Sequence, residues 1–209
     1  MSECADCKVY KCCQGENFPP SCPVTCESVT LSRAFDCYHT EDLEIARVAA
    51  VVEMEGHGSW PRIREVMEFA ERLGYRRIGL AFCVGLREEA RVCTKIFESN
   101  GFEISSAICK TGSVEKKAIG VNNQLKPEKF EAMCNPIAQA ALLEEAGCQL
   151  HVILGLCVGH DTLYFKHAKA PVTVLAVKDR LLAHNPLGAI YASHFYSNKL
   201  KGIIKKKDC

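Results

Sequence analysis

Two apolar runs in this chain end in the same way, with a cysteine followed by valine and glycine. Residues 152–156 lead into Cys157, and residues 78–82 lead into Cys83. An apolar run of this length is typical of a fully buried strand, and the glycine permits a sharp turn into a following helix. The sequence therefore predicts two buried strands, each of which delivers a thiol to the carboxyl edge of a sheet.

The rest of the chain alternates between strand-like and helix-like segments. Strands are expected at 77–82, 102–108, 150–156 and 171–177, and helices at 41–54, 60–73, 86–99, 136–146, 162–167 and from 184 onward. Alternation of this kind predicts an α/β fold, a doubly wound, mostly parallel sheet of about four strands with helices on both faces. The polar stretch 110–127 is long for a loop in a compact domain, and such loops are usually functional or disordered.

The predicted domain repeats itself internally. Cys134-Asn135-Pro136 in its first half corresponds to His184-Asn185-Pro186 in its second, just as the two Cys-Val-Gly turns correspond. We interpret the domain as two related strand-helix-strand-helix units. Chance similarity between short apolar strings is the alternative.

Composition limits the class of protein. The chain has 209 residues with 26 basic and 25 acidic side chains, so its formal net charge of +1 does not favour a nucleic-acid or membrane partner. It also has 14 cysteines, half of them before residue 40, and Met1-Ser2-Glu3 does not begin a signal peptide. We therefore expect a cytoplasmic protein, where a reducing environment favours metal ligation or thiol chemistry over disulfides.

Residues 1–40 form a Cys-rich segment with few aliphatic side chains, ahead of an α/β domain at 41–209. Such a segment cannot build a hydrophobic core, so its order would come from metal bonds. The ligand set that the spacing favours is Cys4, Cys7, Cys12 and Cys22. Four thiolates suit either tetrahedral zinc or an iron-sulfur cluster. Cys13 could replace Cys12, and a reduced segment without metal is the alternative.

A second thiol set is expected at the sheet edge, because ligands of open parallel sheets bind beyond the carboxyl ends of the strands. Its members are Cys83, Cys109, Cys134 and Cys157. They suit a four-iron (4Fe-4S) cluster or a closed zinc site, whereas each cysteine alone could be a small buried hydrophobe. Polar residues expected on the same edge, able to donate protons or bind an anionic substrate, are His160, Lys178 and His184, with Lys110, Asp161 and Asp179 nearby.

Several motifs together resemble one protein family. They are the N-terminal Cys-x2-Cys-x4-Cys with a later Cys-Pro, the two Cys-Val-Gly turns, Cys134-Asn135-Pro136-Ile137, and Lys178-Asp179-Arg180 followed by His184-Asn185-Pro186. Over nearly the whole chain the sequence resembles a family of uncharacterised, Cys-rich metal-binding proteins of anaerobic bacteria and archaea. The resemblance implies metal binding without a known reaction. An anaerobic origin would favour iron-sulfur over zinc in the core site.

A second resemblance is local. Residues 155–160 are similar to the nucleophile elbow of class I glutamine amidotransferases, where a strand-to-helix turn exposes a reactive cysteine. Those enzymes place a His-x-Glu pair late in the chain. Here His184 is followed by Asn185-Pro186 and His194 by Phe195-Tyr196, so the pair is missing. A cysteine hydrolase would need Cys157 without a metal and within hydrogen-bond reach of a histidine.

The leading hypothesis is a metal-binding, iron-sulfur protein with a redox or sulfur-handling role. Its partners would be a redox protein or a small-molecule substrate. The alternatives are a zinc-binding structural, sensor or storage protein, or the hydrolase that uses Cys157. A closed thiolate cage would favour the structural or storage roles, and an open coordination position would favour an enzyme. The sequence assigns no role to Cys13, Cys26, Cys37, Cys93, Cys148 and Cys209.

Overall fold

A computed structural model of the chain describes residues 4–122 and 128–200. The chain divides into two compact units, Met1–His57 and Gly58–Cys209, which we describe separately. The long helix α3 (Thr40–Gly56) belongs to the first unit. The second unit contains the sheet.

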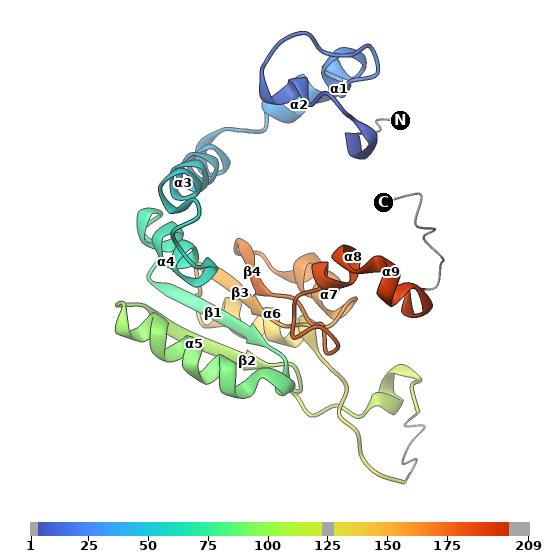
Figure 1. The fold of residues 1–209 in the computed structure, drawn as a ribbon. Helices are drawn as coiled ribbons and strands as arrows, with labels where there is room; N and C mark the ends of the chain where they lie inside the picture. Colours follow the sequence, from blue (N-terminus) through green and yellow to red (C-terminus); the bar gives the residue numbers. More distant parts are fainter. Residues whose placement is uncertain (1–3, 123–127, 201–209) are drawn as a thin grey trace. The chain divides into compact units, whose positions relative to one another are not determined.

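The sheet has four parallel strands in the order β2-β1-β3-β4 (Figure 1). The strands are β1 (Arg77–Phe82), β2 (Glu103–Ile108), β3 (Leu150–Leu154) and β4 (Val172–Ala176). All five residues of β3 are buried, as expected of a central strand covered on both faces. The predicted doubly wound parallel sheet is confirmed.

Helices cover both faces of the sheet. In this unit they are α4 (Arg62–Arg72), α5 (Arg87–Ser99), α6 (Pro136–Glu145), α7 (His160–His167), α8 (Leu187–Tyr191) and α9 (Ser193–Tyr196). One apolar cluster joins α4 and α5 to side chains of β1 and β3, and a second joins α6 and α7 to the opposite face. Side chains alternate between these clusters along each strand; Leu80, for example, is in the first and Ala81 in the second.

Several element ends differ from the sequence prediction by one to three residues, and positive φ values explain two of these differences. The third strand ends at Leu154, two residues early, because Gly155 adopts a φ of 69° that ends the extended backbone. The last helix begins at Leu187 instead of 184, because Ala183 and His184 both have a positive φ. Pro136 opens α6 as predicted, and the amide oxygen of Asn135 caps it by accepting from the Ala138 N–H.

The first unit contains two short helices, α1 (Pro23–Cys26) and α2 (Ser28–Phe35), ahead of the long helix α3. They are preceded by 3-10 turns at Cys4–Asp6 and Lys11–Cys13. Within residues 4–57 the buried residues are Val52 and Gly56, both on α3. The described part of the Cys-rich segment therefore has no apolar core of its own, as its composition predicted.

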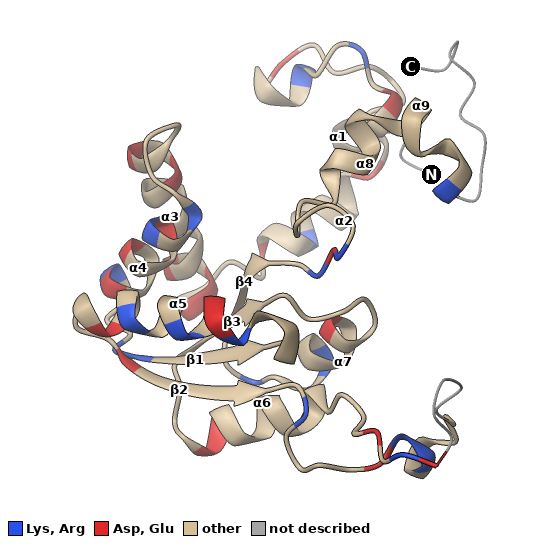
Figure 2. Ribbon diagram, turned by 60° about the horizontal axis from the view of Figure 1, so that its bottom comes forward, with Lys and Arg blue, Asp and Glu red and all other residues tan. Residues whose placement is uncertain are grey.

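The described helices of the sheet unit carry charges of both signs. Basic and acidic residues both occur along α4 and α5, while the strands are almost uncharged (Figure 2). Over the described ranges, no helix is long and apolar enough to cross a membrane.

Candidate metal centre

The sheet order creates a crevice between β1 and β3. From β1 the chain passes outward to β2 and later returns to the other side of β1 as β3. A reversal of this kind separates the connections at the carboxyl ends of two neighbouring strands, which is where open α/β sheets bind ligands. Cys83 directly follows β1, and Cys157 follows β3 by three residues. Both therefore lie at the point of the fold best suited to a ligand.

Cys83 and Cys109 are neighbours across β1 and β2. The parallel register pairs Phe82 with Ile108, and the Cys109 N–H continues it by donating to the Phe82 carbonyl at 2.9 Å. The two thiols lie close enough to act on each other's pKa, and the Val84 N–H donates to the Cys109 Sγ at 3.3 Å. Both cysteines are buried.

Cys134 lies at the same edge of the sheet, at the end of the long connection between β2 and α6. The arms of the segment between β2 and α6 pair with each other, with the Lys116 N–H donating to Glu131 at 2.9 Å and the Met133 N–H to Val114 at 2.8 Å. The Asn135 N–H then donates to the Cys109 carbonyl at 2.8 Å. This pairing returns the chain to the end of β2, so Cys134 packs against the apolar cluster that contains Cys83 and Cys109.

Cys157 lies in the turn between β3 and α7 and has a different partner. The Arg180 Nη2 donates to its Sγ at 3.3 Å. The charges of Cys83 and Cys134 also act on the Arg180 guanidinium and, with Cys157, raise its pKa. We call these four cysteines the core thiol site. Cys83, Cys109 and Cys134 lie together, and Cys157 lies beside them with Arg180 as its partner.

The thiols of Cys83 and Cys109 have pKa values that are shifted in opposite directions. Burial opposes ionisation of Cys83, but the Gly85 N–H and the charge of Lys178, which also hydrogen-bonds the thiol, together hold its pKa below the usual value. Burial raises the pKa of Cys109, and the nearby Cys134 and Cys83 raise it further. The surroundings therefore favour ionisation of Cys83 over ionisation of Cys109.

The remaining predicted polar residues have distinct surroundings. His160 begins α7, and its pKa is lowered by partial burial and by the positive charge of Lys110. The ring Nδ1 of His184 accepts from the backbone N–H of Asp179 at 3.1 Å. The backbone N–H of His184 donates to the Asp179 carbonyl at 2.8 Å. His184 therefore closes the loop after β4. In the described chain it makes no hydrogen bond to a core cysteine, and neither does the ring of His160.

Two residues of this region were not identified from the sequence as site residues. One is Arg180, which lay within a quoted motif but had no assigned role. The other is Gln139 of α6, which is fully buried and whose Nε2 donates to the carbonyls of Phe82 at 3.2 Å and Ala107 at 2.6 Å. It joins the ends of β1 and β2 just before Cys83 and Cys109. A glutamine on a helix carries no sequence signal of such a contact.

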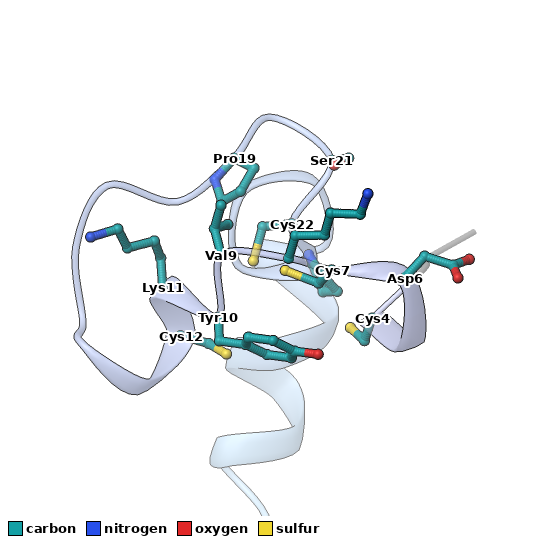
Figure 3. Close-up of a pocket in the computed structure, with 12 residues that line it drawn as sticks. Cys4, Asp6, Cys7, Val9, Tyr10, Lys11, Cys12, Pro19, Ser21 and Cys22 are labelled. Atoms are coloured by element: carbon teal, nitrogen blue, oxygen red, sulfur yellow. The ribbon is translucent and has the colours of Figure 1, made fainter. Parts of the chain in front are cut away.

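In the first unit the predicted ligands surround one cavity of about 420 Å³. Cys4, Cys7, Cys12 and Cys22 all line it, and Figure 3 shows their sulfur atoms turned into the same hollow. Tyr10 lies among them with a left-handed φ of 45°. The backbone N–H groups of Tyr10 and Val9 bond to Cys7 and lower the pKa of its thiol. Backbone donors to a sulfur favour the thiolate, which is the form that binds metal.

Among residues 4–122 and 128–200, no three His, Cys, Asp or Glu side chains already stand as ligands of one ion. The donor chemistry of both sets nevertheless fits a metal, because thiolates are the preferred ligands of zinc and iron-sulfur clusters. Binding would require the ligand cysteines to rotate their side chains from their present orientations toward the metal.

The other cysteines have local roles or none that the structure describes. The thiol of Cys26 donates a hydrogen bond to the Cys22 carbonyl, and the thiol of Cys37 donates to the Arg33 carbonyl. Cys13 is exposed. Burial alone raises the pKa of Cys93 to about 11. Burial also raises the pKa of Cys148. Cys209 lies outside the described residues.

Two comparisons place the chain among known proteins. The family model described as "Protein of unknown function (DUF1847)" matches residues 22–175, which include the whole core thiol site. The chain is also 39% identical over 201 residues to the uncharacterized protein MJ0455 of the archaeon Methanocaldococcus jannaschii, covering 96% of this chain and 99% of that one. The chain therefore belongs to the DUF1847 family, whose function is unknown.

Proposed function

We propose that this protein binds an iron-sulfur cluster at the core thiol site and uses it in a redox or sulfur-handling reaction. The observation that carries the proposal is the convergence of Cys83, Cys109 and Cys134, which pack in one cluster at the carboxyl edge of the sheet. Three thiols from separate segments converge there, at the edge where such folds bind ligands. The paired arms between β2 and α6 contribute the third thiol.

The groups around these thiols support an anionic thiolate centre. Lys178 bonds to Cys83 and Arg180 to Cys157, so two cations balance the charge of the thiolates. The N–H groups of Val84 and Gly85 donate to the sulfurs of Cys109 and Cys83. Hydrogen bonds to the sulfurs and local charge are the means by which proteins set the reduction potential of a cluster.

When bound, a cluster at this site would supply one-electron transfer. The chain's own residues would hold and screen it. Lys178 would favour the thiolate form of Cys83, and Gln139 would fix the strand ends that carry Cys83 and Cys109. Partial burial and the charges of Lys110 and Lys116 lower the pKa of His160, so its ring would be neutral near pH 7 and could accept a proton.

The cavity in the first unit would hold a second metal on Cys4, Cys7, Cys12 and Cys22. Either zinc or an iron-sulfur cluster suits four thiolates. Cys12 rather than Cys13 is the better candidate for the third position, because Cys12 lines the cavity. Metal here would order the Cys-rich segment, since the described residues of that segment bury no side chain.

The test is the iron and acid-labile sulfide content of protein purified without oxygen. We expect the Cys109→Ala, Cys134→Ala double variant to lose about four iron and four sulfide per chain relative to wild type, the content of one cluster. The matched control is Cys93→Ala, which removes a buried thiol on the opposite face of the sheet. It should retain the full content. Equal iron and sulfide in wild type and the double variant would refute the proposal.

A further inference from the structure

We propose that Cys157 does not ligate the cluster, and that Cys157 and Arg180 flank an open coordination position that takes a small oxyanion. This inference rests on the function proposed above. It assigns the cluster three protein ligands, Cys83, Cys109 and Cys134. The substrate or exchangeable ligand would then carry a carboxylate or a sulfur oxyanion.

The first argument is the difference in sulfur contacts. Cys83, Cys109 and Cys134 pack in one apolar cluster at the strand ends. Among the described residues Cys157 is not part of that cluster, and its thiol accepts from the Arg180 Nη2 at 3.3 Å. Cys157 also lies farther from its strand end than Cys83 does, because Gly155 and Leu156 intervene. The trio is therefore already gathered, and Cys157 is set to one side.

The second argument is the exposure and charge of Arg180. The residue is exposed, and the Cys157 sulfur is the side-chain partner that the described structure records for it. A guanidinium has five N–H donors in a planar fork, so donors remain for a ligand from solvent. The charges of Cys83 and Cys134 reach this guanidinium, which places it close to the trio. An incoming group held by Arg180 would thus lie next to the cluster.

The third argument concerns the class of ligand. Lys178 beside Cys83, Arg180 beside Cys157 and Lys110 near His160 bring positive charge to this edge. Lys116 is paired with Glu131, and Asp161 and Asp179 are acids of the same loops. A planar guanidinium pairs best with two oxygens of one anion. A carboxylate or a sulfur oxyanion meets both conditions, and a neutral ligand meets neither.

The first experiment compares the iron and sulfide content of Cys157→Ala and Cys134→Ala, purified without oxygen beside wild type. We expect Cys157→Ala to retain the cluster and Cys134→Ala to lose it. Loss in both variants would make Cys157 a ligand and overturn this inference while leaving the proposed function intact. A wild-type protein without iron would overturn both.

The second experiment titrates reduced protein with acetate and with sulfite and follows the electron paramagnetic resonance spectrum of the cluster. We expect at least one anion to shift the spectrum, and the identity of that anion tells a carboxylate site from a sulfur-oxyanion site. Arg180→Gln should raise the half-saturating concentration on the order of 10-fold, as expected for loss of a charge-assisted bond. The control is Arg91→Gln, which removes a surface guanidinium paired with Glu88 on α5. A wild-type spectrum that neither anion changes, or an equal effect of the two substitutions, would contradict the oxyanion site.

Discussion

His151 lies at the centre of the sheet and is fully buried. Its Nδ1 is 2.9 Å from the Tyr164 hydroxyl, and its Nε2 has no partner in the described structure. Burial lowers the pKa of His151, although the charge of Glu144 opposes the shift. The folded state therefore binds a proton at this ring less readily than the unfolded state, whose histidines titrate near pH 6.5, about the model-peptide value.

From this we predict an acid-sensitive contribution to stability. The contribution is fully present above about pH 6.5, and it is lost as the pH falls below that value because the unfolded chain takes up the proton first. We expect His151→Gln to show a smaller loss of unfolding free energy than wild type between about pH 7 and pH 5. Urea unfolding at several pH values measures this.

Tyr164→Phe is the matched control for this prediction. It leaves His151 buried and titratable but removes its hydrogen-bond partner, which should cost about 1–3 kcal/mol. It should therefore lower stability at neutral pH while keeping the acid dependence of the wild type. A His151→Gln profile parallel to that of wild type would show that this ring does not titrate in the acid transition.

At the residue scale, the sequence located the thiols better than the groups that act on them. Cys83 and Cys109 could be placed because each directly follows a segment that the sequence predicted to be a strand. Arg180 and Gln139 could not, because their contacts cross between segments far apart in the chain. A cysteine after a strand has a position fixed by the sheet, whereas a long side chain on a loop has one fixed only by tertiary structure.

The connection between β3 and α7 sets the position of Cys157. Gly155 has a φ of 69°, and a Cβ built there would lie 2.1 Å from the Leu86 Cδ1. Leu86 belongs to the buried cluster under α5, so it has little freedom to move. Gly159 in the same connection also has a positive φ, of 84°, but a Cβ there would meet no atom within 4 Å.

These two glycines give a matched pair of substitutions. Gly159→Ala should cost about 1 kcal/mol, the strain of a left-handed backbone at a residue with a Cβ. Gly155→Ala carries the same strain and also displaces Leu86, so we expect a loss of about 2–4 kcal/mol in unfolding free energy. Thermal or urea unfolding compares them. Equal losses would mean that Leu86 moves aside at little cost.

At the element scale, periodicity predicted the strands and helices of the sheet unit well. The first strand was predicted at 77–82 and is β1, Arg77–Phe82. Ends were less accurate where a positive φ intervened. Gly155 ends β3 early, and the loop closed by His184 and Asp179 delays α8. A histidine in a left-handed conformation cannot be recognised from periodicity, because the hydrogen bonds to Asp179 that hold it lie within an irregular loop.

The whole molecule joins a sheet unit with an apolar core to a Cys-rich unit that has almost none. In the sheet unit, two apolar clusters cover the two faces. In the first unit, the described residues before α3 contain no buried side chain. Hydrophobic burial is the dominant favourable term in folding, so the two units should differ in what stabilises them. Under the function proposed above, metal bonds from the four cysteines that line the cavity would supply the stabilisation of the first unit.

This difference predicts that removal of metal unfolds one unit and spares the other. A Cys7→Ser, Cys22→Ser variant, or wild type treated with a strong chelator, should lose amide-exchange protection across residues 4–37, because thiolate bonds to the metal supply the folding free energy there. Protection of β1 and β3 should stay at the wild-type level, since their apolar core remains. Hydrogen exchange followed by mass spectrometry reports both regions in one experiment.

A single pair of adjacent cysteines sharpens the test. Cys12 lines the cavity and Cys13 does not appear among its lining residues, although both are exposed and belong to one 3-10 turn. Cys12→Ser should therefore reduce protection of the segment as the double variant does, and Cys13→Ser should leave it intact. The reverse result would move the third ligand to Cys13. Full protection in every variant and after chelation would mean that contacts other than metal bonds order the segment.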